Sequence, residues 1–198
     1  MKKIVTFIAI LISTIAISQT VKPMADFYTD SKPSTPSEVT TLVYYKDVLD
    51  YFTPFLGTWT AQVGTNTFVV TLWKETQKPT EKNGVILYYC DDVFGHYKLV
   101  QNYESPTEIT VYTSEMNYIN SPTPMPTGMY MSSTRLNILG GSIYDVNLMA
   151  EDFLLSRGDL SIEVDSGNPN SATWKVSKDG GLGQTNFVIP KNLILTKQ

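Results

Sequence analysis

Few side chains in this chain are suited to catalytic chemistry. One histidine, His96, and one cysteine, Cys90, occur in 198 residues. A zinc site needs three or four Cys, His or carboxylate ligands, and a serine triad needs an imidazole at one particular place. We therefore expect no catalytic residue, no metal site and no cofactor, and a protein that is not an enzyme. His96 follows a glycine at the start of a β-rich run, which predicts a surface position.

Two adjacent acidic pairs are the remaining candidates for acid and base chemistry. They are Asp91 with Asp92, and Glu151 with Asp152. Neighbours along a strand point to opposite faces, so neither pair makes the facing dyad that glycoside hydrolysis requires. We expect one member of each pair in solvent.

Cysteine and tryptophan are both interpreted as structural. Cys90 ends an apolar run, which predicts a buried and inert thiol. Trp59, Trp73 and Trp174 would stack on sugar rings if they were exposed together. Large aromatics in alternating strands are more often core residues or plugs at the end of a barrel.

Residues 1–18 have the pattern of a secretory signal peptide. Lys2 and Lys3 precede an apolar run, and the small residues Ala16 and Ser18 follow at the positions that a signal peptidase reads. The run is shorter than the roughly 20 residues of a bilayer-spanning helix. We expect cleavage after Ser18 and a secreted or periplasmic product without a membrane span.

Composition limits the partners. Hydrophobic residues make up 42% of the chain and charged residues 17%, which is typical of a folded globular protein. The formal net charge is -4, so no excess of cations is present to neutralise a phosphate backbone. Nucleic acid is excluded as a partner, which leaves a small apolar ligand or a protein that the sequence does not identify.

The N-terminal part of the mature chain is expected to hold one helix. Residues 19–34 lack any periodicity and predict a flexible arm. Thr35 to Glu38 fit a capping box with proline at the first helical position. Leu42, Tyr45 and Phe52 then recur at helical spacing, and Pro54 ends the pattern.

From Phe55 onward the apolar period changes to two and β-forming residues dominate. The expected strands are 57–63, 68–74, 85–90, 97–102, 108–113, 129–139, 143–155, 160–164, 172–177 and 193–197. A loop with three prolines, residues 119–128, interrupts them. We predict one all-β domain over 35–198, an antiparallel calycin-like barrel or curved sheet of about 8–10 strands with one N-terminal helix.

Phe55, Leu56, Gly57, Thr58 and Trp59 form the most recognisable motif. The string resembles the opening of lipocalins and fatty-acid-binding proteins. There the glycine, here Gly57, allows a close turn, and the indole, here Trp59, plugs one end of the barrel. Only the short turn at Gly64, Thr65 and Asn66 joins the first two expected strands, so the helical lid of the fatty-acid-binding proteins is excluded.

The whole chain is similar to a family of small secreted bacterial lipocalin-like proteins of uncharacterised function. The shared features are the signal peptide, F-L-G-T-W, G-x-Y-K at 95–98, T-W-K at 173–175 and the ending from Val188 to Thr196. This resemblance implies a fold and export, with Phe55, Gly57 and Trp59 as structural motif. It transfers no ligand-binding residue.

Three hypotheses for function follow. The first is non-catalytic binding of a small hydrophobic ligand, since a closed sheet of this size can hold one in its mouth. The second is a structural or protein-interaction module of the cell envelope, whose barrel is filled by side chains. The third is a hydrolase with two facing carboxylates. An apolar cavity of about 300 Å³ or more favours the first hypothesis over the second.

Overall fold

The computed structural model describes residues 19–115, 128–135, 137–145, 148, 156–177 and 187–198. The predicted signal peptide, Glu151 and Asp152, and most of the proline-rich loop lie outside these residues. The elements in chain order are β1 (Thr20–Pro23), η1 (Met24–Tyr28), η2 (Pro36–Glu38), β2 (Val43–Lys46), η3 (Thr53–Phe55), β3 (Gly57–Val63), β4 (Asn66–Lys82), β5 (Val85–Gln101), β6 (Ile109–Thr113), β7 (Met129–Arg135), β8 (Ile138–Tyr144), β9 (Arg157–Asp165), β10 (Asn168–Ser177) and β11 (Asn192–Lys197). The η elements are short 3-10 helices. Across the described part of the chain, no helix has the length and apolarity to cross a membrane.

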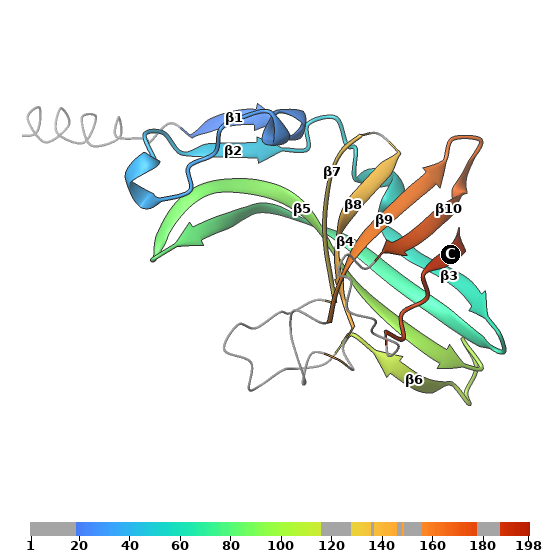
Figure 1. Ribbon diagram of the computed structural model, residues 1–198. Coiled ribbons are helices and arrows are strands. Elements are labelled where there is room, and N and C mark those ends of the chain that lie inside the picture. The colour runs from blue at the N-terminus through green and yellow to red at the C-terminus, as the bar shows by residue number, and fades with distance from the viewer. Residues whose placement is uncertain (1–18, 116–127, 136, 146–147, 149–155, 178–186) are drawn as a thin grey trace, which may run out of the picture.

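Eight strands close into an antiparallel barrel (Figure 1). The order is β5-β4-β3-β11-β10-β9-β8-β7, and β7 pairs with β5 to complete the ring. Consecutive strands are neighbours almost throughout, as the short turns between the expected strands indicate. The expected all-β, calycin-like barrel is confirmed.

The hairpin of β4 and β5 is longer than the barrel that it belongs to. Each strand has 17 residues, and the turn between them is made by Asn83 and Gly84, both with positive φ. The strands expected at 85–90 and 97–102 are therefore one strand. One edge of β5 pairs with β4. Along its other edge, β5 pairs first with β2, then with β7 and then with β6. The outer half of the hairpin projects from the barrel as a curved ribbon (Figure 1).

Residues 19–46, the N-terminal layer, cover this ribbon (Figure 1). β1 pairs in parallel with β2, and β2 pairs in parallel with β5 through Tyr44 and Tyr45. Phe27 of η1 makes edge-to-face ring contacts with Tyr45 and Tyr88. Residues 19–34, expected as a flexible arm, form β1 and η1 and bury Met24.

The expected N-terminal helix is wrong. Thr35 and Glu38 do interact, at 2.8 Å, but the helical turn ends after η2, and β2 occupies the centre of the predicted helix. β-branched and aromatic residues favour extended backbone at Val43 to Tyr45. As a strand, this segment sends Tyr44 and Tyr45 to opposite faces, where both are buried. Tertiary packing therefore overrides the helical spacing.

Large apolar side chains fill the barrel. Strand registers place on the inner face Trp59, Phe68, Val70, Leu72, Val93, Tyr97, Met129, Met131, Leu139, Ile143, Leu160, Ile162, Ala172, Trp174 and Leu195, all at most 8% exposed. Phe68 stacks on Tyr97, with ring centroids 5.9 Å apart, and makes an edge-to-face contact with Trp174 at 5.4 Å. Gly141 makes room for this packing: a Cβ there would lie 2.2 Å from the Tyr130 carbonyl oxygen.

Candidate functional site

The motif Phe55, Gly57 and Trp59 lies where η3 leads into β3. Gly57 has φ +111°, a conformation that favours glycine, and it turns the chain from η3 into β3. The Trp59 indole N–H donates to the Phe55 carbonyl at 2.7 Å, and both side chains are 0% exposed. Trp174 also points inward and is fully buried. Phe55, Trp59 and Trp174 therefore present no surface to a ligand.

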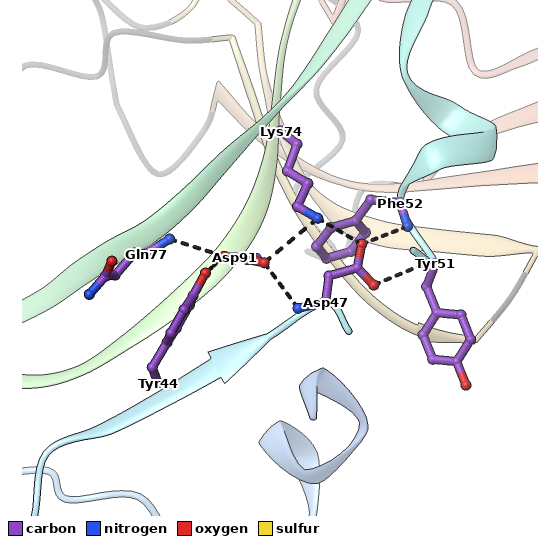
Figure 2. Close-up of polar contacts among 7 residues, drawn as sticks. All are labelled: Tyr44, Asp47, Tyr51, Phe52, Lys74, Gln77 and Asp91. Atoms are coloured by element: carbon purple, nitrogen blue, oxygen red, sulfur yellow. Dashed lines mark hydrogen bonds and ion pairs between the residues drawn. The ribbon is translucent and has the colours of Figure 1, made fainter. Parts of the chain in front are cut away.

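A buried charged cluster joins the N-terminal layer to the ribbon (Figure 2). Asp91 on β5 is 0% exposed. Its carboxylate accepts from the Tyr44 hydroxyl at 2.5 Å, from the Asp47 backbone N–H at 3.0 Å and from the Gln77 backbone N–H at 3.0 Å. Gln77 donates from a left-handed bulge in β4. One carboxylate therefore fixes β2, β4 and β5 together.

Lys74 is the cation of this cluster. Its ammonium lies 3.1 Å from the Asp47 carboxylate and 3.7 Å from that of Asp91. Asp47 in turn accepts from the backbone N–H groups of Tyr51 and Phe52 at 2.8 and 3.2 Å. Both carboxylates are closed off by donors from the protein, so this is a clamp and not an open acid pair. Among the described residues, no three His, Cys, Asp or Glu are grouped as a metal site.

Asp92 and Cys90 point to the other face of β5. As predicted, Asp91 and Asp92 lie on opposite faces, but the prediction that one is in solvent is wrong, since Asp92 is 2% exposed. Burial raises the pKa of Asp92, against hydrogen bonds from Cys90 and Tyr130 and the charge of Lys78. Cys90 is buried, as predicted, and burial raises the pKa of its thiol, aided by the nearby Asp92. Such a thiol is poor as a nucleophile.

His96 and Trp73 lie on the outer face of the barrel. Both are half-buried, with ring centroids 5.0 Å apart. The imidazole Nδ1 is 3.3 Å from the Ser114 hydroxyl, and burial lowers the pKa of His96. The expected surface position of His96 is thus only partly correct. Trp73 does not meet Trp59 or Trp174, so the three indoles form no common platform.

A pocket of about 430 Å³ lies within the N-terminal layer. Its lining residues are Lys22, Asp30, Ser31, Lys32, Pro33, Glu38, Thr40, Thr41, Val43 and Tyr45. They come from β1, from β2 and from the segment between η1 and β2. We call this the N-terminal pocket.

The charged groups of the N-terminal pocket are already paired. Lys22 donates to Asp30 at 2.5 Å and the Tyr45 hydroxyl donates to the same oxygen at 3.1 Å. The Lys22 contact holds the pKa of Asp30 below its usual range. Burial, together with the bond to Asp30, raises the pKa of Tyr45 to about 12. Lys32 donates to the Phe27 carbonyl and sits over the Phe27 ring.

Glu38 also lines the pocket. Its carboxylate accepts from the Ser34 backbone N–H at 2.8 Å and the Thr35 hydroxyl at 2.8 Å, and these bonds lower its pKa. The pocket therefore offers fixed donors and acceptors but no free excess charge. Sequence patterns did not identify it, because its residues are spread over a segment without periodicity. The only local signal was the match of Thr35 to Glu38 to a capping box.

Comparison with known proteins assigns the chain to a family but identifies no activity. A family model described as a family of unknown function, DUF6705, matches residues 1–198. Neither the search of curated proteins nor the search of solved structures finds a match.

Proposed function

We propose, from the premise that the chain belongs to the DUF6705 family, that it is a non-catalytic binding module whose ligand occupies the N-terminal pocket. The observation that carries the proposal is the contrast between two spaces. The barrel interior is packed with aromatic and aliphatic side chains, whereas the N-terminal layer leaves a space of about 430 Å³. That volume falls in the range of small-molecule sites, about 300–1,000 Å³.

The buried acids support a role without catalysis. A general acid or base must reach the proton that it transfers. Asp47 and Asp91 have fully buried side chains and use their oxygens to hold backbone and Lys74 donors. The Cys90 thiol lies in the core cluster. A hydrolase with two facing carboxylates has no support in the described part of the chain.

A small hydrophobic ligand in the barrel has less support than a ligand in the N-terminal pocket. Such a ligand would need to displace Trp59, Phe68 or Trp174, each 0% exposed and in contact with its neighbours. Small eight-stranded barrels are often filled in this way. We therefore assign the barrel the role of scaffold.

A protein-interaction module is the second candidate. The observation in its favour is β6, which exposes Ile109 by 57% and Val111 by 48%. Both lie on this short strand, which pairs with residues 98–101 at the C-terminal end of β5. Apolar side chains on such a strand are suited to contact with another protein.

Pocket blocking tests the proposal. In Thr41→Trp the indole occupies the N-terminal pocket, and Thr65→Trp, in the exposed turn between β3 and β4, is the matched control. Native mass spectrometry of the purified proteins should show a co-purified ligand on the wild type and Thr65→Trp, but not on Thr41→Trp. An apolar probe that binds all three proteins with equal affinity and one-to-one stoichiometry would instead assign the ligand to the barrel and overturn the proposal.

We also propose that the protein is exported by the segment 1–18. N-terminal sequencing of the product recovered outside the cytoplasm should begin at Gln19. A product that starts at Met1 or remains in the cytoplasm would contradict export.

A further inference from the structure

We propose that the N-terminal pocket takes a neutral, polyhydroxylated ligand of the carbohydrate type, of mono- or disaccharide size. This inference rests on the proposed function, because it names the ligand class of the same pocket. Charge balance, hydrogen-bonding capacity and wall composition support it.

The charge balance disfavours an ionic ligand. Two lysines, Lys22 and Lys32, and two carboxylates, Asp30 and Glu38, line the pocket, so their formal charges cancel. Each of these charges already has a partner within the protein. An anion would compete with Asp30 for Lys22, and a cation would compete with Lys22 for Asp30. A neutral ligand requires neither exchange.

The pocket retains hydrogen-bonding capacity of both kinds. Both hydrogen bonds that Asp30 accepts from described residues end on Oδ2, which leaves Oδ1 as an acceptor. Lys22 has three N–H donors and its side chain is 38% exposed. Asp30 and Lys22 thus present an ionised acceptor beside an ionised donor. A hydroxyl donates one hydrogen bond and accepts others, so two adjacent ligand hydroxyls match this pair.

Three further hydroxyls extend the same chemistry. Ser31, Thr40 and Thr41 line the pocket and are exposed. Each is donor and acceptor, and none carries charge. The set suits a ligand with several hydroxyls better than a ligand with one polar end, such as a fatty acid.

The remaining wall is apolar but small. Pro33, Val43 and the Tyr45 ring belong to the lining. They can contact the C–H groups on one face of a sugar ring, while the hydroxyls meet the polar wall. Pockets for apolar ligands are mostly hydrophobic, with only a few polar groups. Here polar residues dominate the lining, which disfavours a lipid.

The experiment compares matched probes on the full mature chain. Saturation-transfer NMR and calorimetry are run with glucose, N-acetylglucosamine and cellobiose, with glucuronate and inorganic phosphate, and with palmitate. Glucuronate differs from glucose by one carboxylate and tests the charge argument directly. We expect saturable binding of at least one neutral sugar, at least tenfold tighter than glucuronate.

Three variants test the assignment of residues. Asp30→Asn removes the ionised acceptor and should weaken sugar binding at least tenfold, whereas Asp159→Asn, an exposed acid on β9, should leave it unchanged. Thr41→Trp should abolish binding and Thr65→Trp should not. If Asp30→Asn does not fold by near-UV circular dichroism, Thr40→Val, which removes one lining hydroxyl and keeps the side-chain size, replaces it and should weaken binding severalfold.

The outcomes separate the inference from the proposed function. If phosphate, glucuronate or palmitate binds and Thr41→Trp abolishes that binding, the pocket is a ligand site but the proposed ligand class is wrong. If neutral sugars bind and Thr41→Trp does not affect them, the N-terminal pocket is not their site, and both proposals fail. If no probe binds, the inference is overturned, while a co-purified ligand lost in Thr41→Trp would still support the proposed function.

Discussion

The barrel and the N-terminal layer rely on different proportions of apolar and polar contacts. Inside the barrel, alternate residues of eight strands pack into one apolar core, which Met24 and Tyr45 of the layer join. The N-terminal layer has two strands of four residues each and attaches to the ribbon through aromatic rings and a buried charged cluster. Apolar burial is non-directional, whereas ion pairs and hydrogen bonds depend on exact partners. We infer that the barrel provides stability and that the layer provides specificity.

Local stability should differ in the same sense. Regions with few apolar contacts open more readily than core strands. β1 pairs only with β2 among the described strands, and β2 shares two registered residue pairs with β5. The layer is thus expected to open without unfolding of the barrel. Four predictions test this comparison, in order of decreasing effect.

Trp59→Ala should have the largest effect. Loss of this fully buried indole from the barrel leaves a cavity and should lower the free energy of unfolding by about 3–5 kcal/mol. Trp73→Ala, on the outer face, should lower it by about 1 kcal/mol. Urea unfolding followed by far-UV circular dichroism measures both. Equal effects would contradict the filled barrel.

Lys74→Met should release the layer and spare the barrel. The change leaves the carboxylates of Asp47 and Asp91 buried without a cation, which costs about 3 kcal/mol. Hydrogen exchange should accelerate in residues 43–52 and remain slow in β9 and β10. Lys74→Arg keeps a cation and should behave nearly as the wild type. Uniform acceleration over the whole chain would show that the two regions are one cooperative unit.

Phe27→Ala should expose the Cys90 thiol. Phe27 contacts Tyr45 and Tyr88, which share a face of the sheet with Cys90. Loss of about 2 kcal/mol of packing should increase the rate of thiol labelling about 30-fold. Tyr103→Ala, in the turn after β5, is the control and should leave the rate unchanged. An unchanged rate in Phe27→Ala would mean that η1 does not protect the thiol.

Asp92→Asn should have the smallest effect, and one that depends on pH. The folded pKa of Asp92 is raised by burial, so its stabilising contribution is complete below the unfolded value of about 3.9 and is lost as pH rises through the folded pKa. At pH 7 the variant should be more stable than the wild type, by about 1 kcal/mol. At pH 3 the difference should vanish. A variant less stable at pH 7 would show that the Lys78 charge outweighs burial.

Much of the barrel could be predicted from the sequence. Buried and more exposed residues alternate along all of β9, over residues 171–177 of β10 and over residues 58–62 of β3, because one face of each strand is buried and the other is in contact with solvent. The motif at Gly57 and Trp59 is visible in the sequence, and in the structure Gly57 has φ +111° and Trp59 is fully buried. In β5 the signal fails: Cys90 to Gly95 are buried on both faces, so the run lacks alternation.

The N-terminal layer and its site could not be predicted in this way. Tyr45 sits at helical spacing from Leu42 and Phe52, and contact with β5 helps to select the strand. Asp47, Lys74 and Asp91 lie far apart in the sequence and meet through the bulge at Gln77. Apart from the match of Thr35 to Glu38 to a capping box, nothing local marks a pocket whose walls come from three separate segments. Sequence patterns reveal segments in which burial is periodic, and the residues of this site do not lie in such a segment.

The parallel pairing of β2 with β5 also constrains the order of assembly. A polypeptide is made from its N-terminus, so residues 19–46 leave the ribosome before their partner strand exists. Asp91, to which the Tyr44 hydroxyl donates, comes 47 residues later. Until β5 is complete, β2 has no sheet edge to pair with, and Tyr44 and Tyr45 cannot be buried against it. Residues 19–46, although synthesised before the barrel, are therefore expected to be the last to dock.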